Sequence, residues 1–142
     1  ELLIVVLILG ILAAVVIPQF NDTAVTAKES SLVANLQTVR QAIALYRVQH
    51  NEVYPGQTDW DELVTQLSTQ TDQSGAAGTQ YGPYLRTGFP INPMTMTATG
   101  KNVATMPGSP SGDEAYVYSP RNGELRANVA GTAPSGTLYW DL

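Results

Sequence analysis

The first part of the chain is apolar on every side. Residues 2–17 contain no polar side chain, and this run lies between Glu1 and Pro18. A helix of this composition has no polar face to turn towards water, so it has to be buried in lipid or in other protein chains. At about 1.5 Å per residue the run is about 24 Å long, a little short of a bilayer hydrocarbon core of about 30 Å. We therefore expect residues 1–20 to be a hydrophobic helix segment that lies in a membrane or among other copies of the same chain.

From Gln19 onwards the pattern becomes amphipathic. No glycine or proline follows until Pro55, and apolar residues recur at alternating steps of four and three, which is the spacing of one helix face. The residues of this stripe are Leu32, Leu36, Val39, Ile43 and Tyr46. We predict that residues 21–52 are the amphipathic half of the same helix, which is about 50 residues long in all. The stripe then packs against a globular head formed by residues 53–142.

The head begins with a short helix and a polar loop. Thr58 and Asp61 have the spacing of a capping box, and the apolar residues between positions 60 and 67 share one helical face. Residues 69–82 are mostly small and polar, which indicates a surface loop with little area to bury. Proline and glycine are frequent from there to Gly112, and this composition excludes a central strand.

The last part of the chain predicts a small sheet. Residues 115–119 and 124–129 are short alternating runs on either side of Pro120-Arg121-Asn122-Gly123, a strong turn signal, so they predict a hairpin. Residues 138–142 also alternate and predict a terminal strand. We therefore expect an α+β fold in which a long N-terminal helix packs on an antiparallel sheet of about three strands.

Charge and composition exclude several classes of function. The formal net charge of -5 disfavours the phosphate backbone of a nucleic acid as a partner. The absence of cysteine excludes disulfides, thiolate metal sites and a cysteine nucleophile. The single histidine, His50, lies at a predicted helix end, where capping explains it better than catalysis. No acidic run has the spacing of a calcium loop. We predict no enzymatic activity and no cofactor or metal.

The N-terminal segment carries the most specific motif of the chain. Glu1 precedes the apolar run, Gly10 interrupts it, and Pro18 ends it shortly before Phe20. This segment resembles the N-terminal segment of type IV pilins and type II secretion pseudopilins, with charge, glycine and proline at the family's spacing over about twenty residues. The resemblance identifies Glu1, Gly10, Pro18 and Phe20 as assembly residues and implies a pilin-like fold.

The resemblance also implies a route of assembly. A short leader would be removed a few residues before Glu1, and the first residue that remains would be N-methylated. The chain would stay anchored in the inner membrane until the pilus assembly machinery adds it to a helical filament of identical subunits. The resemblance thus implies that the chain ends up in an extracellular filament at the cell surface.

Two assembly roles have competing explanations. A carboxylate beside a long apolar run is costly to desolvate unless it is paired. In the family the partner of the residue at Glu1 is the N-terminal amine of a neighbouring subunit, whereas a lipid headgroup position also suits a negative charge at a helix start. Pro18 removes one helical hydrogen bond, so the helix between Gly10 and Pro18 either unwinds in the assembled filament or only kinks.

Three functions remain open. The chain is a major pilin of a type IV pilus, a major pseudopilin of a type II secretion system, or a monomeric membrane-anchored binding module. Major pseudopilins commonly hold calcium in an acidic loop near the C-terminus, whereas residues 130–142 contain only one carboxylate, Asp141. Pseudopilins also tend to have an Asp-Pro-Trp-Gly run where residues 91–94 differ. Both observations favour the pilus.

Overall fold

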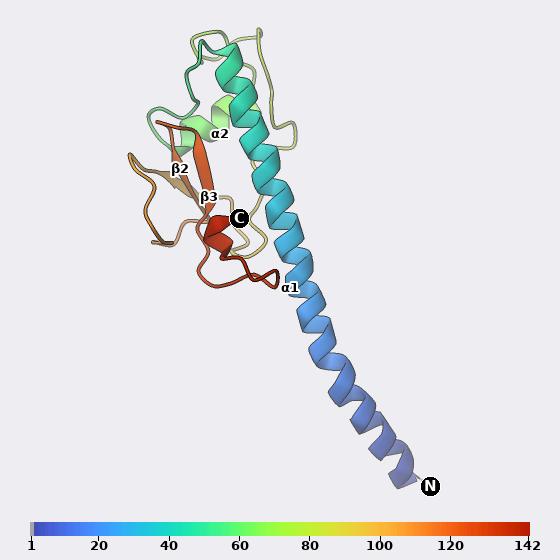
Figure 1. The fold of residues 1–142 in the computed structure, drawn as a ribbon. Coiled ribbons are helices and arrows are strands. Elements are labelled where there is room, and N and C mark those ends of the chain that lie inside the picture. Colours follow the sequence, from blue (N-terminus) through green and yellow to red (C-terminus); the bar gives the residue numbers. More distant parts are fainter. Residues whose placement is uncertain (1) are drawn as a thin grey trace.

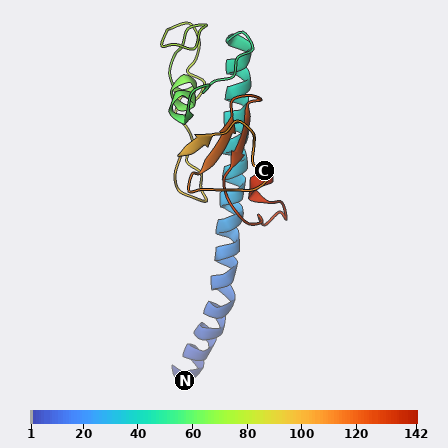
Figure 2. The same ribbon diagram turned by 90° about the vertical axis from the view of Figure 1, so that its left-hand side faces the viewer.

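One long helix runs into a small head. The computed structural model describes residues 2–142, and the side chains of residues 14–22 lie outside that description. Helix α1 (Leu2–Gln49) projects beyond the head at its N-terminal end, and its C-terminal part lies along the head (Figure 1). A view turned by 90° shows the same division between the bare part of α1 and the part that the head covers (Figure 2).

The end of α1 is determined by local backbone geometry. Asn51 and Glu52 adopt positive φ values of 54° and 64°. A right-handed helix cannot continue through residues with positive φ. The Glu52 N–H donates to the carbonyl of Arg47 at 2.9 Å, and the Glu52 carboxylate forms an ion pair with the Arg47 side chain. The chain therefore turns back from the end of α1 into the head.

The second helix begins one residue later than its capping signal predicted. In α2 (Trp60–Ser68) the cap is Asp59, whose carboxylate accepts the Glu62 N–H at 2.8 Å. The Glu62 carboxylate in turn accepts the Thr58 N–H at 2.7 Å. The predicted Thr58 and Asp61 pair is thus wrong by one position, because Asp59 followed by Glu62 has the same spacing and two carboxylates that accept these N–H groups.

The sheet has three strands in mixed orientation. Its order is β1 (Gly100–Asn102), β2 (Tyr116–Ser119) and β3 (Glu124–Ala127). Strands β2 and β3 are antiparallel and form the predicted hairpin, in which the Gly123 N–H donates to the Ser119 carbonyl at 2.9 Å. Strand β1 pairs with β2 in parallel, so the prediction of an antiparallel sheet is wrong. The α+β class and the hairpin are confirmed.

The predicted terminal strand is a 3-10 helix, η1 (Tyr139–Asp141). A strand that rests on one face of a core buries every second residue. Here Tyr139 and Trp140 are adjacent and both buried, while Leu138, which should have faced inwards, is 50% exposed. An extended backbone would direct these two consecutive side chains to opposite faces, whereas the 3-10 turn buries both. The third strand is instead β1, in the proline-rich stretch and at the edge of the sheet.

The elements share one hydrophobic core. Helix α1 contacts β3 and α2, and the tyrosines of β2 lie between them. Trp60 of α2 stacks on Tyr116 with ring centroids 6.0 Å apart, and the Tyr118 hydroxyl donates to the Pro55 carbonyl at 2.9 Å. All four residues of β2 are buried. The head is therefore held on one side of α1 by side chains from α2, β2, β3 and η1.

Candidate functional site

Among the described residues, the N-terminal part of α1 is an extended apolar surface without a partner. Every large apolar side chain from Leu2 to Leu12 is exposed, with exposed fractions between 51% at Ile8 and 85% at Leu3. A helix with one packed face would alternate between covered and exposed positions. Here no face is covered, and a side chain at Gly10 would meet nothing within 4 Å. This surface can be buried only by another molecule.

The predicted assembly residues are described only in part. Glu1 lies outside the described residues, as do the side chains of Pro18 and Phe20. Their roles stay predictions, and Gly10 lies within the exposed apolar part of α1. The side chains of residues 14–22, which include the end of the apolar run, are not described. Among the described residues, no helix is long and apolar enough to cross a bilayer.

The amphipathic half of α1 buries its stripe against the head. Leu32, Leu36, Val39, Ile43 and Tyr46 are all buried in the core. Val25, one heptad before Leu32, is exposed, and coverage of the helix by the head starts at Glu29. The head therefore covers α1 only from about its middle, and the apolar residues before it stay free.

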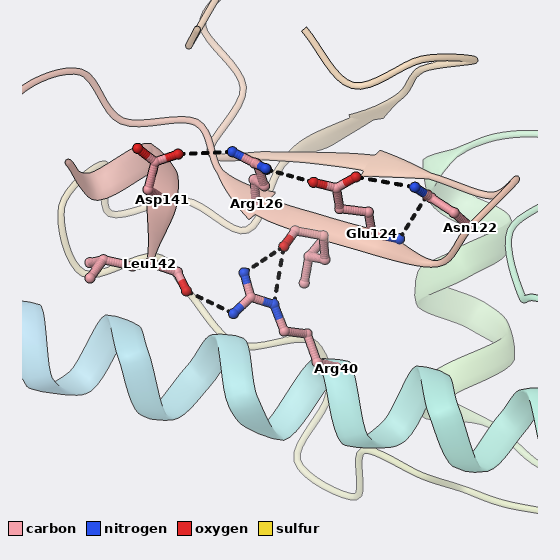
Figure 3. Close-up of polar contacts among 7 residues, drawn as sticks. Arg40, Asn122, Glu124, Arg126, Asp141 and Leu142 are labelled. Atoms are coloured by element: carbon pink, nitrogen blue, oxygen red, sulfur yellow. Dashed lines mark hydrogen bonds and ion pairs between the residues drawn. The ribbon is translucent and has the colours of Figure 1, made fainter. Parts of the chain in front are cut away.

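A guanidinium group connects α1 to the edge of the sheet (Figure 3). Arg40 donates from Nε at 3.2 Å and from Nη2 at 2.8 Å to the main-chain oxygen of Leu125, and from Nη1 at 2.8 Å to that of Leu142. Burial lowers the pKa of Arg40, and the nearby charge of Arg126 lowers it further. Strand β3 is an edge strand, where a buried carbonyl without a donor would be costly. Arg40 therefore joins three separate segments of the chain.

Sequence reasoning missed this role of Arg40. It identified only the apolar stripe of α1 as the surface that packs against the head. The signal that could have found it is its position, four residues after Leu36 and three before Ile43, which borders the buried stripe. An arginine there can lay its stem along the core and carry its donors to a neighbouring segment.

A second polar chain ties η1 to the hairpin, as Figure 3 also shows. Arg126 donates to Glu124 at 2.7 Å and to Asp141 at 3.0 Å, and its guanidinium lies 5.4 Å from the centroid of the Trp140 ring. The Asn122 side chain bonds both the N–H and the carboxylate of Glu124 at 3.1 Å. The hydrogen bond from Arg126, followed by that from Asn122, lowers the pKa of Glu124 against the opposing effect of burial. The network fixes η1 beside strand β3.

The other end of the head is held by His50. Its ring stacks on Tyr46 at 3.7 Å, Nδ1 lies 2.8 Å from the Tyr46 carbonyl, and Nε2 lies 3.0 Å from the Thr71 hydroxyl. A carbonyl only accepts, so Nδ1 carries a proton in this geometry. The prediction that His50 caps the helix is confirmed. Thr71 is buried, which corrects the expectation that residues 69–82 form only a surface loop.

A groove separates α1 from the turn at the base of the head. Its volume is about 670 Å³, and it is lined by one face of α1 and by Pro134 and Ser135. Glu29 lies in it and is only 8% exposed. Its carboxylate accepts the Ser135 N–H at 3.3 Å. This groove combines a nearly buried charge with an open side.

The described residues offer little to a metal ion, because no three histidine or carboxylate side chains among them come together. The features that the described residues do offer are surfaces, namely an exposed apolar helix and a groove between α1 and the base of the head. No family model, no curated protein and no solved structure matches the chain.

Proposed function

We propose that this chain is the structural subunit, the major pilin, of a type IV pilus-like extracellular filament. The observation that carries the proposal is the apolar part of α1, which is exposed on all faces. If neighbouring copies shield on the order of 1,000 Å² of it, the gain relative to water is about 25 kcal/mol. A surface of this kind is not kept bare in water, and copies of the same helix offer a matching one.

The proposal includes a membrane stage before assembly. Lipid also covers an apolar helix, so moving the subunit from lipid into a filament gains far less than moving it from water. The transfer therefore needs assembly machinery, and the subunit waits in the inner membrane. The resemblance of the segment around Glu1, Gly10, Pro18 and Phe20 to pilins supports the same route.

The attachment of the head supports this arrangement. Arg40 and the buried stripe hold the head along the C-terminal part of α1, and the first residues of the helix project past it. Helices of several copies can then gather in a core while their heads remain on the outside. Such a contact joins different surfaces of two copies, and it continues into a helical fibre when the rotation does not close.

A pseudopilin is the alternative closest in construction. It would use the same apolar helix in a short periplasmic fibre. The structure offers one observation against it: Asp141, the only carboxylate of residues 130–142, bonds Arg126 at 3.0 Å. A calcium loop needs several free oxygen ligands. The pilus is therefore the preferred assignment, ahead of the pseudopilin and of a monomeric membrane-anchored module.

Electron microscopy of material sheared from the cell surface tests the proposal. We expect long filaments, and mass spectrometry of these filaments should identify this chain as their main component. Val6→Lys places a charge in the exposed apolar surface and should abolish the filaments. Thr79→Lys adds the same charge to an exposed loop of the head and should leave them intact.

The outcomes separate the three functions. Filaments of this chain on the cell surface support a pilus. A chain that stays in the periplasm, together with loss of protein secretion in its absence, would assign it to a secretion pseudopilus. A chain found only as a membrane-bound monomer would refute assembly altogether.

The proposed role of Glu1 has its own test. Glu1→Leu keeps the apolar run and removes only the charge. If the carboxylate sets the register between subunits by pairing with a neighbour's amine, the filament yield should fall strongly. Unchanged yield would show that Glu1 only marks the lipid interface.

A further inference from the structure

Glu29 is a nearly buried carboxylate that has no cationic partner among the residues of its own chain that the structure describes. In the described part of the molecule the four ion pairs all involve other carboxylates, and Glu29 accepts one hydrogen bond, from the Ser135 N–H at 3.3 Å. A carboxylate withdrawn from water is stabilised mainly by a paired cation. It lies in a groove open to a neighbour, beside the apolar side chains of Val33 and Pro134.

Arg121 is the complementary group at the opposite end of the head. It lies in the turn between β2 and β3, is exposed, and takes part in none of the ion pairs of the described residues. The neighbouring turn residues Asn122 and Gly123 lie beside Ala44 and Val48 of α1. Val48 is itself largely exposed. This end of the head thus offers a free cation next to an apolar side chain.

The two features cannot meet within one subunit. Glu29 and Ala44 are 15 residues apart on α1, which corresponds to about 22 Å along the helix axis. The groove is at the base of the head, and the β2–β3 turn lies near the end of α1. Two copies with parallel α1 helices, displaced along the axis, bring the base of one head to the turn of the next.

We propose that the Glu29 groove of one subunit receives Arg121 of a neighbouring subunit. The proposal rests on the filament proposed above and names a contact between its heads. The charges are complementary, and Val48 beside the turn provides an apolar contact for Val33 and Pro134 of the groove. The contact joins two different surfaces, so each subunit can make it once with each of two neighbours and the fibre can extend.

The other exposed cations fit less well. Lys28 lies next to Glu29 on α1. It could therefore reach the groove of a second copy only if the bases of the two heads faced each other. A contact between two identical surfaces closes as a dimer and adds nothing to a fibre. Arg86 follows the segment that bonds the end of α2, where the Leu85 N–H donates to the Leu67 carbonyl at 2.8 Å. It is exposed and serves as the matched control.

Charge reversal in the full-length chain tests the contact through the filament yield. Arg121→Glu should lower the yield of sheared filaments about tenfold, since it removes one charge of a largely desolvated pair and adds repulsion. Arg86→Glu changes the net charge equally and should leave the yield as in the unaltered protein. Glu29→Lys should also lower the yield, and combining it with Arg121→Glu should restore the filaments.

A second variant covers the case in which a lysine in the groove prevents folding. Glu29→Gln keeps the shape of the side chain and its bond from Ser135, and it should reduce the yield in the same direction as Arg121→Glu. A full filament yield with Arg121→Glu would overturn the assignment of Arg121. The assignment would also be wrong if Arg86→Glu lowered the filament yield and Glu29→Lys restored it. Absence of filaments from the unaltered protein would instead refute the proposed function, so the two failures are distinguishable.

Discussion

Replacing Arg40 by methionine should loosen the head from α1. The substitution keeps most of the apolar stem and removes the guanidinium, so the main-chain oxygens of Leu125 and Leu142 lose their donors. A hydrogen bond from a charged group contributes about 1.5–3 kcal/mol, and partial exposure of Arg40 favours the lower end of that range. Two oxygens then amount to about 3 kcal/mol of unfolding free energy. At about 2–4 °C per kcal/mol, the melting temperature should fall by about 9 °C.

The measurement is thermal unfolding of the full chain in detergent, followed by near-UV circular dichroism of the head aromatics. Arg40→Lys retains a charge but reaches one acceptor at a time, so it should recover about half of the loss. Arg86→Met removes an exposed arginine and should leave the melting temperature unchanged. Replacement of a buried charge by an apolar residue is sometimes neutral, but here the acceptors remain behind without donors. A melting temperature for Arg40→Met within about 1 °C of the unaltered protein would refute this reasoning.

Three further predictions concern the head. Asp59→Ala removes the carboxylate that caps α2 and should lower the unfolding free energy by about 1 kcal/mol, whereas Asp59→Asn should keep most of it; equal losses in both would exclude capping as the cause. Gly123→Ala should destabilise the hairpin by more than 1 kcal/mol, since Gly123 has a φ of 71° and a Cβ there would clash with the Tyr54 ring; chemical unfolding with no change in midpoint would contradict this. The pKa of Glu124 is lowered on folding from its ordinary 4.5, so its ion pair stabilises the head above about pH 4.5 and the benefit is lost as the pH falls through the folded pKa. Glu124→Gln should therefore flatten the fall of melting temperature below pH 4.5, and an unaltered acid-side slope would show that the pair contributes nothing.

The elements that sequence reasoning found are those with a local cause. The β2–β3 hairpin follows from a turn whose glycine accepts positive φ, and α2 follows from a cap and an apolar face within nine residues. Even there the cap was placed one residue early, because Thr58 and Asp59 both satisfy the rule for a cap and only the folded backbone distinguishes them. The steps of four and three along α1 likewise identify the side chains that are buried in the core.

The features that sequence reasoning missed depend on partners far away in the chain. Strand β1 has no alternation of its own and is a strand only because β2 offers it a parallel edge. The 3-10 turn of η1 buries two consecutive aromatic side chains, Tyr139 in the core and Trp140 beside Arg126 of β3. Arg40 bonds carbonyl groups 85 and 102 residues later. Its position beside the buried stripe could indicate a contact with the head, but nothing near it in the sequence identifies these two acceptors.

By itself, the sequence determined that one end of this protein must be covered by another molecule, because residues 2–17 leave no face for water. It also determined which stripe of α1 carries the head and where the hairpin turns, since helix periodicity and turn preferences act over a few residues. Only the tertiary structure decided the direction of β1, the anchoring by Arg40, and the position of Glu29 in a groove at the opposite end of the head from Arg121. Each of these depends on residues that are distant in the chain and are brought together by packing, which no local pattern encodes.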